Sequence, residues 1–257
     1  MRPARAWKLL GALAVVVVIG GAGVYALTLR SQPAPLGLTT NLRTPASTST
    51  PNDPLAQACR QPPMPAGSAR PGLSGLWVIQ PGSVAGYRAH EKFAELPSPH
   101  VAVARTERVS GWLLAAEQVG VRSIETGCVA VDLSTLFSVD ELPGFNTADR
   151  DKSARDFLNV HVHPFAIFQP YPTRVDADIS SGTPVRVRVA GLLEVNGVSK
   201  QVNFDLTTRL SNSQAAVAGS TTVAVGDYGV DVPQEVGGFV AVDPNITLEI
   251  SLVLLRP

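Results

Sequence analysis

Apolar and polar residues alternate along much of the chain after residue 73. The alternation is strictest in residues 185–189, 202–206 and 246–254. A period of two places apolar side chains on one face of a strand and polar side chains on the other, so these segments predict β-strands. Weaker forms of the same pattern predict further strands at residues 77–79, 84–90, 101–114, 119–131, 165–168 and 215–225.

Two segments between the predicted strands carry other signals. The dipeptide Asn196-Gly197 joins two alternating segments, and this pair favours a two-residue hairpin turn. Residues 146–158 are highly charged and do not alternate, so we expect one or two short helical turns on the surface. About nine strands can hide their apolar faces in a sandwich or in a closed barrel, and the pattern alone favours neither. We therefore predict one all-β domain at residues 73–257.

The N-terminal part of the chain is apolar. Residues 9–29 contain no charged side chain, and a helix of this length would be about as long as the hydrocarbon core is thick, about 30 Å. Three basic residues lie within residues 1–8, whereas Arg30 alone follows the segment. The positive-inside rule then predicts a single-pass transmembrane anchor with a cytoplasmic N-terminus. A cleaved signal peptide is the alternative, and both interpretations place residues 31–257 outside the cytoplasm.

The segment at residues 30–72 differs from the parts on either side of it. It is rich in Pro, Ser and Thr and has no periodic apolar pattern. Such composition is typical of an extended chain without a packed core. We expect a disordered linker between the anchor and the β domain.

Composition narrows the classes of function. The 257 residues include 21 basic and 21 acidic side chains, and this balance argues against a nucleic-acid partner. A hydrophobic content of 45% excludes disorder over the whole length. Cys59 and Cys128 are the only cysteines, which excludes a disulfide-dense scaffold and a four-cysteine zinc site. They can form an intramolecular disulfide, remain as thiols or bridge two chains, and the sequence leaves these alternatives open.

Motifs for catalysis are weak. The sequence has no Gly-x-Ser-x-Gly nucleophile motif, no phosphate loop and no dinucleotide fingerprint. His161 and His163 would share one face of a strand and could ligate a metal, but we favour a packing role. We therefore predict no enzyme activity, no cofactor and no metal site.

Four groups of residues resemble motifs of the YceI-like (polyisoprenoid-binding) family, and the resemblance covers residues 74–257. In chain order these groups are Trp77 with Gly86-Tyr87, then Arg150-Asp151 with Phe157, His163-Pro164 and Phe168, then the turn Gly197-Val198-Ser199-Lys200, and finally Asp227-Tyr228-Gly229. The resemblance implies a single extended, antiparallel, lipocalin-like β-barrel. In the family this barrel has an apolar interior that encloses a long isoprenoid chain.

The resemblance also assigns roles to single residues. It implies that Arg150 and Asp151 make structural hydrogen bonds near the barrel mouth, and that Gly197 and Asp227 are structural motif residues. The chain departs from the family at His163, where an aromatic residue is usual, and at Glu91, where His is frequent. These departures affect the ligand more than the barrel.

We expect a membrane-tethered bacterial envelope protein that binds an isoprenoid or similar slim lipid without catalysis, as a carrier or by sequestration. The alternative is a ligand-free interaction or stress-related module with a filled barrel. Strand parity predicts nine residues as walls of the lipid site. They are Tyr87, Ala89, Val187, Val189, Phe204, Leu206, Val223, Ile250 and Leu252.

Overall fold

The chain divides into two compact units, Met1–Ala34 and Pro35–Pro257, and the second is described below. The computed structural model describes residues 32–39, 53–62, 73–93, 99–118, 120–142, 146–176, 182–211, 213–233 and 240–256. The predicted anchor at residues 9–29 lies outside these ranges. None of the helices within them has the length and hydropathy that a membrane span requires.

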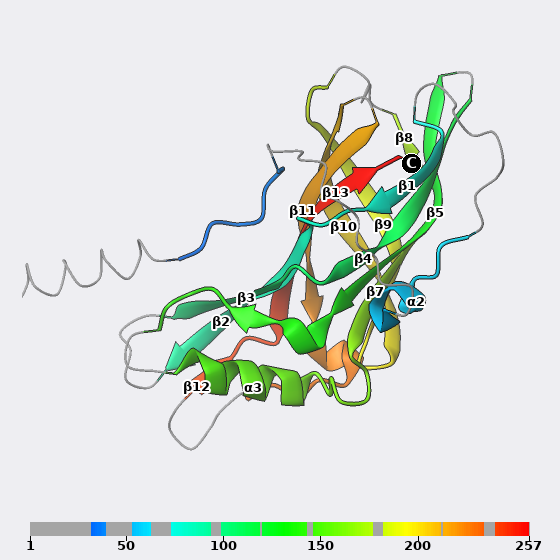
Figure 1. Cartoon of the computed structure of the whole chain (residues 1–257). Coiled ribbons are helices and arrows are strands. Elements are labelled where there is room, and N and C mark those ends of the chain that lie inside the picture. Colours follow the sequence, from blue (N-terminus) through cyan, green and yellow to red (C-terminus); the bar gives the residue numbers. More distant parts are fainter. Residues whose placement is uncertain are drawn as a thin grey trace, which may run out of the picture. The chain divides into compact units, whose positions relative to one another are not determined.

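The thirteen strands among the described residues form one antiparallel sheet, which consists of eight long strands (Figure 1). Five of the eight are each interrupted once, and three are continuous. In chain order they are β1 (Gly75–Ile79) with β2 (Val84–Phe93), β3 (His100–Thr106) with β4 (Val109–Gln118), β5 (Val121–Asp132) with β6 (Phe137–Ser138), β7 (Phe165–Pro170) with β8 (Thr173–Val175), β9 (Val185–Val195), β10 (Val198–Ser211), β11 (Gln214–Ala224), and β12 (Val240–Val242) with β13 (Asn245–Leu255).

The sheet closes into a barrel. Each long strand pairs with the next one along the chain, and β13 pairs with both β1 and β2. Closure removes the exposed edges that an open sheet would present. The fold is thus an all-β, eight-stranded, lipocalin-like barrel. The alternation allowed either a sandwich or a barrel, and the structure is a barrel.

The turn between β9 and β10 confirms the hairpin prediction. Val195 pairs with Val198, and Asn196 and Gly197 between them have positive φ angles of 51° and 73°. A two-residue turn of this kind matches the twist of the strands but requires left-handed backbone at both positions. Asn and Gly tolerate that conformation better than other residues do.

One helix, α3 (Thr147–Phe157), confirms the expected helical segment. Asn146 caps it, because its side chain accepts a hydrogen bond from the Ala148 amide at 3.1 Å. Asp149 in the first turn and Arg155 in the last turn both suit the helix dipole. Figure 1 shows α3 beside β12 at one end of the barrel, with β8 at the opposite end. Two short 3-10 helices complete the elements, η1 (Leu133–Thr135) and η2 (Val225–Tyr228).

The barrel end away from α3 is filled by side chains. Trp77, Ile79, Leu252 and Leu254 belong to one buried cluster there. Trp77 is only 3% exposed, and its indole Nε1 donates a hydrogen bond to the Leu73 carbonyl at 2.9 Å. This tryptophan therefore closes the barrel interior at that end.

The prediction of a disordered linker is wrong for two segments of residues 30–72. Helix α2 (Pro54–Ala58) follows the capping residue Asp53, and it buries Leu55 and Cys59. The physical reason is that two apolar side chains four residues apart suffice to dock a single turn, which is too short to give a periodic signal.

The second of these segments, residues 35–39, lies along the outer face of β13. Ser251 Oγ donates a hydrogen bond to the Gly37 carbonyl at 2.8 Å, and Arg209 Nη2 donates one to the Thr39 carbonyl at 3.2 Å. The segment is held by its backbone carbonyl groups. Every residue has such a group, so the composition of the segment could not reveal that it docks on the barrel. Apart from residues 32–39 and 53–62, the predicted linker lies outside the described residues.

Candidate functional site

An apolar cavity of about 450 Å³ occupies the end of the barrel next to α3. Its volume lies within the range of small-molecule sites, about 300–1,000 Å³. The walls come from seven of the eight long strands, all except β3 with β4, from one face of α3 and from residues 230–233. Most of the lining side chains are aliphatic or aromatic, including Val131, Leu136, Phe168, Leu193, Leu248 and Ile250.

Five of the nine predicted wall residues line this cavity. They are Tyr87, Ala89, Phe204, Val223 and Ile250.

The other four predicted wall residues are not part of the lining. Val189 and Leu252 are buried, while Val187 and Leu206 are half-buried. Leu252 and Val187 belong to the packed core at the Trp77 end. Strand parity identifies the face on which a side chain lies, but not its height along the barrel axis. Those four positions lie outside the cavity, and their assignment to a ligand site stays a prediction.

Helix α3 contributes a lining face that the sequence analysis missed. The residues on this face recur with helical spacing, and they are Asn146, Thr147, Asp149, Arg150, Ser153, Ala154, Phe157 and Leu158. Phe157 is both 42% exposed and part of the lining, so it lies where the cavity meets solvent. The apolar residues of the last helical turn were the available signal.

Arg150 holds a cluster of charged groups at the cavity mouth. Its Nη2 lies 2.6 Å from Asp140 Oδ1, and its Nη1 lies 3.3 Å from Glu91 Oε2. Arg150 Nη2 also donates a hydrogen bond to Ser138 Oγ at 2.7 Å. Glu91 and Arg150 both line the cavity, whereas Asp140 does not. The guanidinium group is thus bound on several sides before any ligand arrives.

Asp140 also contacts two groups of β3 besides Arg150. Its Oδ1 accepts a hydrogen bond from the Val103 amide at 2.8 Å, and its Oδ2 lies 2.7 Å from His100 Nε2. Its side chain is only 1% exposed. Burial by itself would raise its pKa, but the hydrogen bonds from His100 and Arg150 outweigh burial and hold the pKa of Asp140 well below its usual range.

Two other groups at the mouth have shifted acidity. Burial raises the pKa of Glu91, and Arg150 only partly offsets this effect. Burial likewise raises the pKa of Tyr87 well above its usual range. The Tyr87 hydroxyl is protonated at neutral pH, as tyrosines ordinarily are, and can donate a hydrogen bond.

Asp151 ties α3 to the barrel wall. Its carboxylate accepts hydrogen bonds from the Ser138 amide at 3.0 Å and from the Ser138 hydroxyl. Because Arg150 and Asp151 both bond to Ser138 of β6, the pair positions the helix over the cavity. This is the structural hydrogen-bonding role that the resemblance implied.

The remaining motif residues lie around the same end of the barrel. Gly197 faces the His163 ring, which a Cβ atom at Gly197 would approach to 2.7 Å. Asp227 is exposed in η2, and the neighbouring Tyr228 lines the cavity. Burial, with Asp227 as a second cause, raises the pKa of Tyr228 to about 12. Its buried hydroxyl has no hydrogen-bond partner among the described residues.

The histidine pair considered for metal binding does not lie on a strand. Residues 161 and 162 form a turn, and His161 is exposed to solvent. Within the ranges that the structure describes, no group of three or more His, Cys, Asp or Glu side chains could hold a metal ion.

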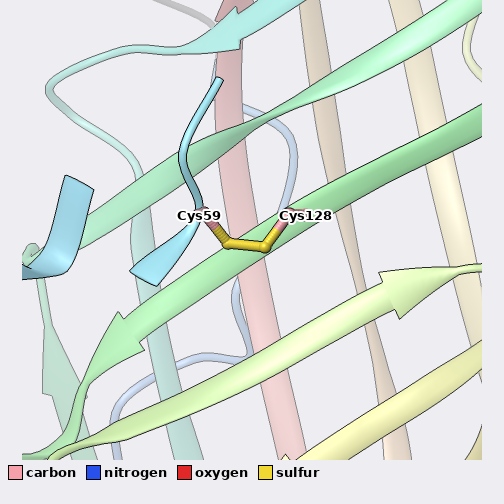
Figure 2. The surroundings of a disulfide bond; sticks show 2 residues. All are labelled: Cys59 and Cys128. Atoms are coloured by element: carbon pink, nitrogen blue, oxygen red, sulfur yellow. A yellow bond between two sulfur atoms is a disulfide. The ribbon is translucent and has the colours of Figure 1, made fainter. Parts of the chain in front are cut away.

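Cys59 and Cys128 form an intramolecular disulfide that fastens α2 to the outside of the barrel (Figure 2). Their Cα atoms lie 5.5 Å apart, and 69 positions separate them in the sequence. Leu55, both cysteines and Ala130 form a small buried cluster beneath the helix. This cluster does not belong to the cavity lining, so the disulfide stabilises the wall rather than the site.

Comparison with known proteins identifies the fold. A polyisoprenoid-binding domain from Saccharophagus degradans, implicated in plant cell wall breakdown, superposes with a TM-score of 0.50 at 14% identity. The match covers 71% of this chain and 98% of that one. BcnA of Burkholderia cenocepacia matches with a TM-score of 0.49 at 12% identity, and the match covers 68% of this chain and 98% of that protein. No curated protein matches the sequence. Residues 100–254, more than half of the chain, match the YceI-like domain, and the chain therefore belongs to the YceI-like family.

Proposed function

We propose that this protein binds a slim lipid, such as an isoprenoid, in the barrel cavity and carries or sequesters it without chemical change. The apolar cavity of about 450 Å³ is the observation that carries the proposal. Burial of a hydrocarbon chain there gains about 25 cal/mol per Å² of apolar surface. The similar domain from Saccharophagus degradans is described as polyisoprenoid-binding, which supports the same ligand class here.

The distribution of polar groups supports an amphipathic ligand. The charged side chains Glu91 and Arg150 lie at the α3 end, whereas Phe168 and Leu193 deeper in the barrel are apolar. Beyond them the Trp77 cluster closes the barrel. A lipid would place its chain among the apolar walls and its head group near α3.

The cavity also argues against the alternative of a filled barrel. A module that acts only through its surface needs no interior space, and native interiors are close-packed. An unfilled volume of this size is costly unless a ligand occupies it, because its lining loses van der Waals contacts.

We further propose that the barrel lies outside the cytoplasm and is tethered to the membrane by residues 9–29. The Cys59–Cys128 disulfide supports this location, because disulfides persist in oxidising compartments and are rare in the cytosol. Protease protection of the full chain in intact and in opened cells tests the topology. Degradation of the barrel only after the inner membrane is opened would overturn it.

A matched pair of substitutions on β11 tests the cavity. Val223 lines the cavity and Thr222, its neighbour, faces solvent. The full chain carrying Val223→Phe should retain several-fold less radiolabelled geranylgeraniol than the wild type, because the larger ring occupies ligand volume. Thr222→Phe should bind as the wild type does.

Thermal unfolding of both variants separates a blocked cavity from a misfolded barrel. Phe204→Ala, which removes a ring from the cavity wall, provides a second variant that does not depend on overpacking. It should change the preferred chain length of the bound alcohol. Equal binding by Val223→Phe, Thr222→Phe and the wild type would contradict a site inside the barrel.

A further inference from the structure

Acidic residues outnumber basic residues in the cavity lining. Among the described residues that line it, Arg150 is the only basic one, whereas Glu91, Asp149 and Glu249 are acidic. Glu249 is neutralised on the outer face of the barrel, because its carboxylate lies 2.6 Å from Arg88 Nε and 3.9 Å from Arg105 Nη2. The charge that a ligand meets is therefore set at the α3 end.

At that end the acids outnumber the bases. Arg150 is paired with both Glu91 and Asp140, and Asp151 lies on the other side of Ser138. His100 contacts Asp140 and adds a positive charge only when it is protonated. Even then, the four carboxylates Glu91, Asp140, Asp149 and Asp151 outnumber the cations Arg150 and His100.

Arg150 has little capacity left for an anionic ligand. Its side chain is only 15% exposed, and Asp140, Glu91 and Ser138 occupy its nitrogen atoms. A phosphate that displaced Glu91 or Asp140 would take the guanidinium partner from a buried carboxylate, which is strongly unfavourable. A phosphate that displaced neither would add negative charge beside existing carboxylates in a low-dielectric site.

Uncharged hydrogen-bonding groups meet no such barrier. The Tyr87 side chain lies in the field of Arg150 and Glu91 and lines the cavity. Tyr228 also lines the cavity, and its buried hydroxyl lacks a partner among the described residues. A ligand hydroxyl or carbonyl oxygen can bond to groups of this kind without carrying charge into the site.

Resting on the lipid-binding function proposed above, we infer that the Arg150–Glu91–Asp140 cluster selects isoprenoids with an uncharged, hydrogen-bonding head group over prenyl phosphates. The ligand class is that of a prenyl alcohol. In this role Arg150 orders the carboxylates and the helix, and it does not act as a phosphate receptor.

Competition between two head groups on one hydrocarbon chain tests the inference. The full chain is loaded with radiolabelled geranylgeraniol, and either unlabelled geranylgeraniol or geranylgeranyl phosphate is added as competitor. The phosphate should compete about tenfold less well, which corresponds to about 1.4 kcal/mol. Equal or stronger competition by the phosphate would overturn the inference.

Substitution of Glu91 tests whether the Arg150–Glu91–Asp140 cluster causes the head-group preference. Glu91→Gln removes one negative charge at nearly constant volume, so it should narrow the alcohol-to-phosphate preference by about threefold. The matched control is Glu107→Gln, because Glu107 is exposed and lies outside the cavity lining. If both variants keep the wild-type preference, the cluster does not set it.

The two proposals fail in different ways. If the labelled alcohol never binds, the lipid-binding function fails and the inference about its head group falls with it. If the alcohol binds and the phosphate binds as tightly, the cavity function stands and only the head-group selection is wrong. The ratio of alcohol to phosphate competition in the wild type decides whether the head group is selected, even if Glu91→Gln impairs folding.

Discussion

Two carboxylates bound to the same guanidinium group have pKa values shifted in opposite directions, although burial raises both. Asp140 gains enough hydrogen bonds that its pKa falls well below its usual range, whereas the pKa of Glu91 is raised. Asp140 therefore contributes stability above its unfolded pKa of about 3.9, and this contribution is lost as the pH falls. The Glu91 contribution is complete below its unfolded pKa and is lost as the pH rises through its folded pKa.

Asp140→Asn should lower the free energy of unfolding at neutral pH by about 3–5 kcal/mol, because it leaves Arg150 and His100 without their shared partner. The deficit relative to the wild type should shrink as the pH falls below about 4, where the wild type loses the same interaction. Urea unfolding over a pH series measures both effects. A deficit that stays constant with pH would contradict the depressed pKa.

Glu91→Gln should show the opposite pH dependence. Its stability relative to the wild type should improve as the pH rises above about 4.5, because the wild type must then ionise a buried carboxyl group. The same urea series measures the difference. A relative stability that worsens with rising pH would mean that Arg150 outweighs burial at this carboxylate.

At the scale of elements, the β9–β10 hairpin depends on one glycine. Gly197 has a φ of 73°, and an added Cβ would lie 2.7 Å from the His163 ring. Gly197→Ala should therefore lower the free energy of unfolding by about 1–2 kcal/mol or more. Gly226→Ala is a suitable control, because a Cβ there meets nothing within 4 Å. Equal denaturant midpoints for the two variants would contradict the requirement for a left-handed residue at position 197.

Helix α3 is held to the barrel by the polar contacts of Arg150 and Asp151 rather than by buried side chains. None of its eleven residues is buried, and an isolated helix of this length is marginal in water. We expect its amide protons to exchange faster than those of β10, and we expect bound lipid to slow them. Asn146→Ala, which removes the cap, should weaken the helix by about 1 kcal/mol and speed lipid release. Exchange rates in α3 that equal those in β10 would contradict the expectation that this helix opens more readily than the strands.

At the scale of the molecule, the sequence predicted the barrel better than the site. Alternation located most strands, because one-sided burial imposes a period of two, and the Asn196-Gly197 pair located the hairpin. Val187 and Leu252 pack in the core at the Trp77 end and lie outside the cavity, because parity does not reveal which end of the barrel is filled. Asp140 was missed because a loop brings it to Arg150, and no local pattern marks such a contact.

The disulfide extends the folded unit beyond the barrel strands. Cys59 and Cys128 close a long loop, and in the chain-entropy model such a bridge contributes about 4 kcal/mol at most. The double variant Cys59→Ser/Cys128→Ser should lose about 2–4 kcal/mol of unfolding free energy in guanidinium chloride. A reductant should weaken the wild type in the same way and leave the double variant unchanged.

Loss of the disulfide should lower the stability of the barrel but not its affinity for lipid. Neither cysteine lines the cavity, and α2 lies on the outer wall, so the double variant should keep its affinity for geranylgeraniol wherever the barrel remains folded. A loss of both stability and affinity would indicate that the wall carrying β5 deforms when the bridge is absent. A loss of stability alone would mean that the bridge holds the barrel together while the side chains at the α3 end determine what it binds.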